Sequence, residues 1–62
     1  MEFNYSLQFE DGTWYTGYAL TLAELMVRRS KYRYEAFTYT EQQAHKIKDT
    51  FPTANLTVVR VN

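Results

Sequence analysis

Four of the seven basic residues of this 62-residue chain lie in one short segment, residues 28–34, with no acidic residue among them. The cations are interleaved with tyrosines, and the candidate binding residues here are Arg28, Arg29, Lys31, Tyr32, Arg33 and Tyr34. Cations can bind phosphates while rings stack on bases, a pattern typical of single-stranded nucleic-acid binding. Arginine and tyrosine are also common anchors of protein interfaces, so the segment is compatible with protein docking as well.

A purely structural role for the same residues stays open. Arg28 can pair with Glu24 one helical turn earlier, and Arg29 and Lys31 can stabilise the C-terminal end of a helix. Arg33 can lie on the solvated face of a strand. The formal net charge of zero argues against nucleic acid, because most nucleic-acid-binding domains are basic overall.

The sequence offers little for catalysis or metal binding. Its one imidazole, His45, lies off the apolar stripe of a predicted helix, with Glu41 and Asp49 one turn away on either side. That placement is typical of a solvated surface histidine, and one imidazole between acids is a poor metal site without further ligands. The two glycines, Gly12 and Gly17, form no phosphate-binding motif. We therefore predict no enzymatic activity, no metal and no cofactor.

The length predicts a single domain over residues 1–62, near the lower size at which one hydrophobic core stabilises a fold. Cysteine is absent, so disulfides are excluded and oligomerisation, as a homodimer, is the remaining common means of stabilisation. Polar residues interrupt the first ten positions, and no apolar run approaches the roughly 18 residues of a membrane span. We expect a cytoplasmic protein that does not bind membranes.

A first strand is predicted by apolar residues at alternate positions, Phe3, Tyr5, Leu7 and Phe9. Asp11-Gly12 predicts a tight turn into a second strand that ends near Leu20. With a two-residue turn, Phe9 faces Trp14, and Tyr15 lies on the opposite, exposed face. A bulged three-residue loop would reverse that assignment. We expect Trp14 and the Phe3, Leu7, Phe9 row in the core, and Tyr15 as a surface binding residue.

Two helices are predicted by capping boxes. Residues 21–24 open a helix over residues 22–30, and residues 40–43 open a helix over residues 41–51, which Pro52 ends. The second helix has a buried stripe consisting of Ala44, Ile47 and Phe51.

Strands predicted over residues 32–38 and 56–61 complete the order β-β-α-β-α-β. This order indicates a two-layer α+β fold, a mixed four-stranded sheet with two helices on one face. The uncovered face would carry exposed aromatic residues, drawn from Tyr15, Tyr32, Tyr34, Phe37 and Tyr39. An exposed patch of this kind usually marks an interface.

The C-terminal half, from Ala36 to Val59, resembles small accessory proteins encoded by phages and prophages. The features that carry the resemblance are an aromatic residue, a Thr-capped helix with alanine on its inner face, a Phe-Pro stop and a Val-rich strand. The resemblance implies a protein that acts in the host cytoplasm by stoichiometric binding, including inhibition of a host or defence protein. It implies no catalytic residues.

Together these patterns favour a non-enzymatic binding protein that docks on a protein partner through Tyr15 and residues 28–34. The alternative is a small nucleic-acid-binding module that uses the same basic and aromatic residues.

Overall fold

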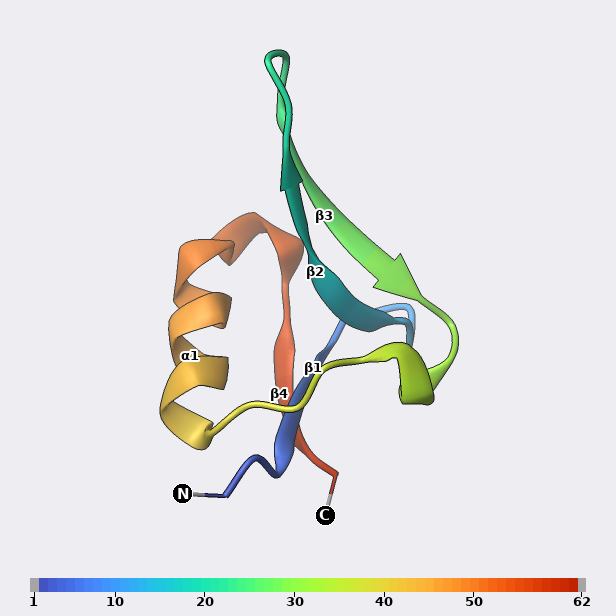
Figure 1. Cartoon of the computed structure of the whole chain (residues 1–62), viewed down its shortest axis with the longest axis vertical. Coiled ribbons are helices and arrows are strands. Elements are labelled where there is room, and N and C mark those ends of the chain that lie inside the picture. The colour runs from blue at the N-terminus through green and yellow to red at the C-terminus, as the bar shows by residue number, and fades with distance from the viewer. Residues whose placement is uncertain (1, 62) are drawn as a thin grey trace.

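The computed structural model describes residues 2–61. Its elements, in chain order, are β1 (Tyr5–Gln8), β2 (Trp14–Leu20), β3 (Leu25–Ser30), the 3-10 turn η1 (Arg33–Glu35), α1 (Glu41–Thr50), the 3-10 turn η2 (Pro52–Ala54) and β4 (Thr57–Arg60). The strands form one sheet in the order β3-β2-β1-β4, and each neighbouring pair is antiparallel. The helix α1 packs against β1 and β4 (Figure 1). The α+β class is thus confirmed, whereas the mixed sheet and the second helix are wrong.

The core lies between α1 and the sheet. Its buried apolar members are Leu7, Phe9, Tyr15, Ala44, Phe51 and Leu56. The stripe predicted on the helix is confirmed, because Ala44 and Phe51 are buried and Ile47 packs against them. Phe3, expected in the core, is 51% exposed because it precedes β1, and Trp14 is half-buried.

The loop between Phe9 and Thr13, which extend the pairing of β1 and β2, has three residues rather than two. Phe9 N donates to Thr13 O over 2.8 Å, and Gly12, with a φ of 88°, donates to Phe9 O over 3.1 Å. A positive φ of this size favours glycine. Because of the extra loop residue, Gln8 lies opposite Trp14 in the β1–β2 register, and the Tyr15 side chain faces α1. Tyr15 is therefore only 2% exposed. The expectation that Tyr15 lies on the surface is therefore wrong, because one residue of register reverses the faces of a strand.

The helix predicted over residues 22–30 is wrong as well, since Leu25–Ser30 form β3. Thr21 Oγ1 accepts hydrogen bonds from Ala23 N and Glu24 N, as in a capping box. However, Thr21 N donates to Glu24 O over 2.9 Å, which closes a tight turn between two strands. The β1–β2 pairing is short, so the backbone groups of β2 need a second strand, and β3 supplies it.

The strand predicted over residues 32–38 is replaced by a turn. The Ser30 hydroxyl accepts a hydrogen bond from Tyr32 N over 3.1 Å and donates one to Glu35 Oε1 over 2.7 Å, which leads the chain into η1. Farther on, Tyr39 exchanges two backbone hydrogen bonds with Tyr5, at 3.1 and 2.7 Å. The aromatic residues of this region therefore do not form the single uncovered sheet face that we expected.

The helix α1 follows its sequence signals. Thr40 accepts a hydrogen bond from Gln43 N, and the Gln43 side chain accepts one from Thr40 N, so the predicted capping box is confirmed. The helix ends at Thr50, two residues before Pro52. Asn55, with a φ of 54°, then turns the chain into β4.

Candidate functional site

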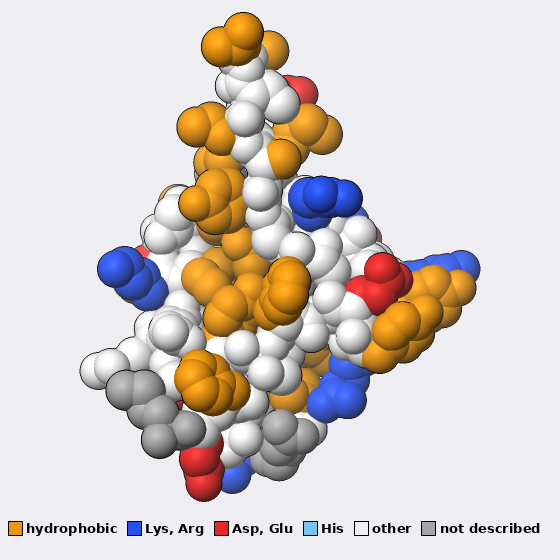
Figure 2. All heavy atoms as spheres, viewed as in Figure 1, with side chains coloured by type: hydrophobic (Ala, Val, Ile, Leu, Met, Phe, Trp, Pro, Cys, Tyr) orange, Lys and Arg blue, Asp and Glu red, His pale blue; other side chains and the backbone are white. Residues whose placement is uncertain are grey.

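The distal parts of β2 and β3, with the turn that joins them, project from the rest of the molecule (Figure 1). We call residues 18–27 the arm and the remainder the body. The arm exposes the large apolar side chains of Tyr18, Leu20, Leu22, Leu25 and Met26. Leu20 is 78% exposed, and Leu22, in the turn, is fully exposed. Figure 2 shows hydrophobic side chains from the tip of the arm down to the centre of the body.

One face of the arm continues the face of the sheet that α1 covers. In the β2–β3 register Tyr18 lies opposite Val27, and Leu20 lies opposite Leu25. Residues directly opposite each other share a face. The Tyr18 ring lies 5.5 Å from the Phe51 ring at the end of α1, so this face is the helix side of the sheet. The apolar surface thus extends along the arm past the point where the helix ends.

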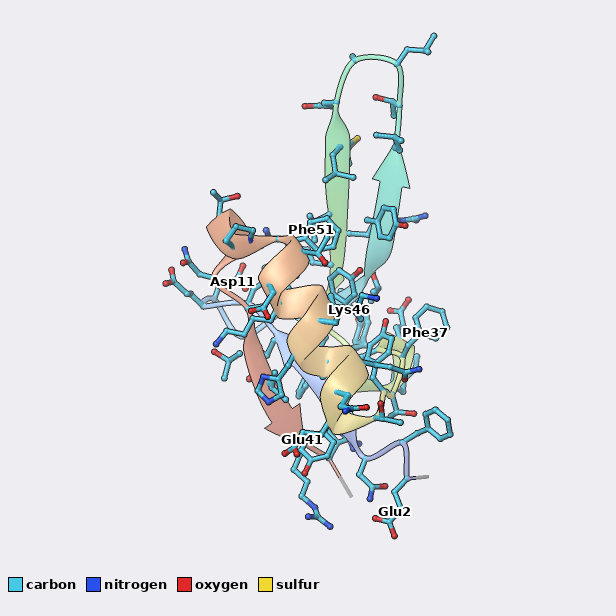
Figure 3. The ribbon with its side chains drawn as sticks, turned by 90° about the vertical axis from the view of Figure 1, so that its left-hand side faces the viewer. Glu2, Asp11, Phe37, Glu41, Lys46 and Phe51 are labelled. Carbon is cyan, nitrogen blue, oxygen red and sulfur yellow. The ribbon has the colours of Figure 1, made fainter. Side chains whose placement is uncertain are left out.

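A hollow of about 520 Å³ lies where the arm meets α1. Its lining is mostly apolar and consists of Tyr15, Gly17, Tyr18, Leu25, Phe37, Tyr39, Lys46, Ile47, Thr50 and Phe51. Figure 3 labels three of these residues, Phe37 in the loop before α1, Lys46 on α1 and Phe51 at its C-terminal cap. The hollow and the arm together form one continuous apolar surface, because Tyr18 and Leu25 belong to both.

Two tyrosines that line the hollow, Tyr15 and Tyr39, are neutral near pH 7. Burial raises the pKa of Tyr15 to about 12, with smaller contributions from the neighbouring Tyr39 and Tyr18. Burial also raises the pKa of Tyr39, whose ring lies 6.5 Å from that of Tyr15. Apart from the side chain of Lys46, the hollow therefore offers an uncharged surface of aromatic and aliphatic groups.

Two arginines of the segment 28–34 are bound to the body. Arg29 Nη1 lies 3.2 Å from Asp11 Oδ2, and the guanidinium carbon lies 4.0 Å from the centroid of the Phe9 ring. Hydrogen bonds from Thr13 hold the pKa of the Asp11 carboxyl below its usual value, and Arg29 acts in the same direction. Arg33 donates a hydrogen bond to Val61 O over 2.8 Å. These contacts give both arginines structural roles, although neither is the helix cap or strand face expected from the sequence.

The other candidate residues of the segment divide into two places. The rings of Tyr32 and Tyr34 stack with centroids 5.4 Å apart, and the Lys31 ammonium lies 5.1 Å from the Tyr32 centroid. Tyr34 is 81% exposed. Arg28 is exposed on β3, on the opposite side of that strand from Arg29. The structure thus brings Lys31, Tyr32 and Tyr34 together and places Arg28 apart from Arg29.

The arm was missed by sequence reasoning. Its leucines fitted the buried arc of a helix, whereas Leu25, Met26 and Val27 form a short apolar run that is equally compatible with a strand. That ambiguity was the available signal, but it could not show that α1 would stop short of the arm.

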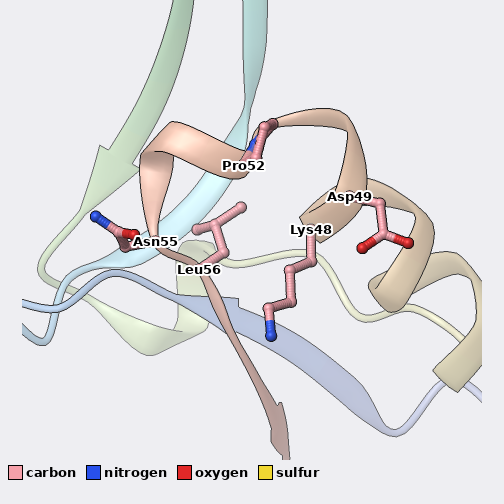
Figure 4. Close-up of a pocket in the computed structure, with 5 residues that line it drawn as sticks. All are labelled: Lys48, Asp49, Pro52, Asn55 and Leu56. Carbon is pink, nitrogen blue, oxygen red and sulfur yellow. The ribbon is translucent and has the colours of Figure 1, made fainter.

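Among residues 2–61, no group of three or more His, Cys, Asp or Glu side chains is placed to hold a metal ion. His45 is exposed on α1. A smaller hollow of about 410 Å³ is lined by Lys48, Asp49, Pro52, Asn55 and Leu56 (Figure 4). No helix in the described part of the chain has the length and apolar character needed to cross a membrane.

Comparisons with protein-family models, with curated proteins and with solved structures found no match to this chain. The resemblance of the C-terminal half to phage accessory proteins therefore stays a prediction.

Proposed function

We propose that this chain is a non-catalytic protein-binding domain of the cytoplasm that docks on its partner through the arm and the hollow. The observation that carries the proposal is a continuous apolar surface from the exposed Leu22 to the buried Tyr15. Contiguous exposed apolar surface usually marks a protein interface. The tyrosines at its centre suit this role, because a tyrosine ring tolerates an environment that is apolar on one side and wet on the other.

The shape of the molecule supports this function. The accessible surface is 4660 Å², whereas a compact monomer of 7.4 kDa would expose about 4,200 Å². The excess agrees with an arm that projects from the body. Burial of the fully exposed Leu22 would contribute about 1.5–3 kcal/mol to binding before the costs of association. The arm can therefore make a large contribution to binding from a few side chains.

Site-specific photo-cross-linking tests the proposal. A benzophenone amino acid replaces Leu22 at the tip of the arm, and in a second variant it replaces Phe3, which is also exposed but lies outside the arm and the hollow. Both variants are illuminated in cells of the organism that encodes the chain. We expect a discrete protein adduct from position 22 that is weak or missing from position 3.

The matched position makes the result decisive. Equal adducts from both positions would indicate random collisions, and the absence of any adduct from position 22 would refute docking through the arm. The mass of the adduct also reports whether the partner is a different protein or another copy of the chain.

A second candidate function is single-stranded nucleic-acid binding, and one observation favours it. The exposed stack of Tyr32 and Tyr34 beside Lys31 is a small platform on which bases can stack. Binding of a labelled single strand is measured at two salt concentrations, with Tyr34→Ala as the variant. Affinity that falls steeply with salt and falls with Tyr34→Ala would support this function. No binding at low salt would eliminate it.

A further inference from the structure

We propose that the occupant of the arm and the hollow is a second copy of this chain, whose arm lies antiparallel across the first so that each tip fills the hollow of the other copy. This inference rests on the proposed function and names its partner.

Shape is the first support for a second copy. The chain carries both a projecting apolar tip, at Leu22, and an apolar hollow at the base of the same arm. From Tyr18 to Leu22 an extended chain spans about 13 Å. The distance from tip to hollow is the same in both copies, so a single two-fold rotation brings each tip to the other hollow. Closed two-fold dimers are the commonest symmetric assembly because one surface serves both sides.

The available area is the second support. The exposed apolar side chains of the helix-side face, of the turn at the tip and of the hollow are Tyr18, Leu20, Leu22, Leu25 and Phe37. Together they offer on the order of 500 Å² per copy. Two copies would then bury on the order of 1,000 Å², which is the lower limit for a specific interface. A reversible dimer is expected rather than a permanent one.

Charge is the third support. Glu24 is the one charged residue between Gly12 and Val27, and it lies at the tip of the arm. Lys46 is the cation that lines the hollow. Exchange of the arms brings Glu24 of one copy toward Lys46 of the other. The alternative dimer, in which two β3 strands pair edge to edge, would place Arg28 and Arg29 of both copies close together. Repulsion between these like charges opposes that alternative.

Sedimentation equilibrium of the purified chain measures the association, from about 1 μM to about 1 mM, the range in which a small interface dissociates. We expect a monomer–dimer equilibrium that Leu22→Asp weakens at least tenfold. The matched control is Phe3→Asp, which adds the same charge at an exposed apolar position of the body and leaves the association unchanged. Both positions are exposed, and circular dichroism confirms the fold of each variant.

A charge exchange tests the orientation of the arms. Glu24→Lys and Lys46→Glu each weaken the dimer, because each places like charges together, and the double variant restores association.

Disulfide formation tests directly whether the tip of one copy lies in the hollow of the other. The chain has no cysteine of its own, so introduced cysteines can pair only with each other. A copy with Leu22→Cys is mixed with a copy with Thr50→Cys, a residue that lines the hollow. The mixed disulfide is expected to form faster than with Phe3→Cys in place of Leu22→Cys.

Specific outcomes overturn the inference. A chain that remains monomeric over the whole range, or a dimer that Phe3→Asp dissociates as strongly as Leu22→Asp, would exclude arm exchange. A monomeric chain that still gives a photo-adduct with a different protein at position 22 would leave the proposed function standing and remove only the second copy as its partner. The two failures are thus distinguishable.

Discussion

The body and the arm contain the same kinds of apolar residue in opposite surroundings. In the body, β1 pairs with β2 on one side and β4 on the other, and α1 covers the sheet, so Leu7 is 0% exposed. In the arm, β2 and β3 pair with each other beyond the end of the helix, and Leu20 is 78% exposed. An isolated two-stranded hairpin is only marginally stable in water. The contrast shows that burial of a side chain here is decided by which element lies over it, not by its residue type.

The largest expected difference between the two regions is in the free energy of unfolding. Leu7→Ala removes packed atoms from the core and should lower that free energy by about 2–5 kcal/mol. The total for a domain of 62 residues is about 3–9 kcal/mol, so this variant should be largely destabilised. Leu22→Ala removes a solvated side chain and should change it by no more than about 0.5 kcal/mol in the monomer. Urea unfolding of both variants at low protein concentration checks the comparison.

Protein concentration sharpens the same comparison. If arms exchange between copies, the cost of Leu22→Ala rises with concentration, because dimerisation stabilises the folded state by mass action. The cost of Leu7→Ala reflects packing within one chain and stays nearly constant. A Leu22→Ala effect as large as that of Leu7→Ala at low concentration would show that the arm is packed against the body.

The parts of the fold that could be predicted from the sequence are those whose signals are local. The capping box at Thr40, the stripe through Ala44 and the stop at Pro52 agree with one another, and α1 forms as predicted. The segment of β3 has no such agreement, because its apolar residues fit both a helix and a strand. The hydrogen-bonding needs of β2 decide between them, and those needs depend on how far β1 extends.

The candidate site shows the same limit. The exposure of Tyr32 and Tyr34 follows from their turn position, and they lie beside Lys31 as neighbours in the sequence. The place of Tyr15 depends on one residue in the preceding loop, which the Asp11-Gly12 pair does not determine. The exposed face of the arm depends on where α1 ends relative to β2, a long-range property that no local pattern encodes.

The junction between body and arm gives the next prediction. At this point a β-bulge shifts the β2–β3 register between Tyr15 and Gly17, and Gly17 has a φ of 115°. A side chain at that φ is strained, so Gly17→Ala should lower the free energy of unfolding by about 1–3 kcal/mol. A Cβ at this position would meet no atom within 4 Å, so the cost comes from the backbone alone. Thermal unfolding measures it, and an unchanged midpoint would show that the bulge is not required.

The two Thr residues in capping-box sequences provide a smaller, paired test. Thr40 caps α1, whose packing stabilises the core, and Thr40→Ala should cost about 1 kcal/mol. Thr21 makes similar hydrogen bonds in the exposed turn of the arm, and Thr21→Ala should cost less because the arm can fray without unfolding of the body. Amide hydrogen exchange should show faster exchange confined to the arm in Thr21→Ala. Faster exchange throughout α1 in that variant would contradict the separation of the two regions.

The smallest effect at neutral pH, and the most specific, concerns the phenol of Tyr15. Burial raises its pKa in the folded chain to about 12, above the ordinary value of 10.0 for tyrosine, so the neutral form is the one that folding favours. The contribution of the neutral phenol to stability is complete below pH 10 and is lost as the pH rises from about 10 to about 12. Tyr15→Phe cannot ionise, so its unfolding free energy should match that of the wild type near pH 7 and fall less at alkaline pH.

The exposed Phe3 supplies the control for this prediction, because Phe3→Leu changes no ionisable group and should leave the alkaline loss of stability unchanged. Absorbance of the phenolate, followed with pH, should likewise lose its latest-titrating component in Tyr15→Phe. Equal alkaline losses in the wild type and Tyr15→Phe would mean that water reaches the Tyr15 ring in the folded chain. The hollow would then lack the dry, uncharged floor that an apolar tip requires, and docking would have to rely on the arm alone.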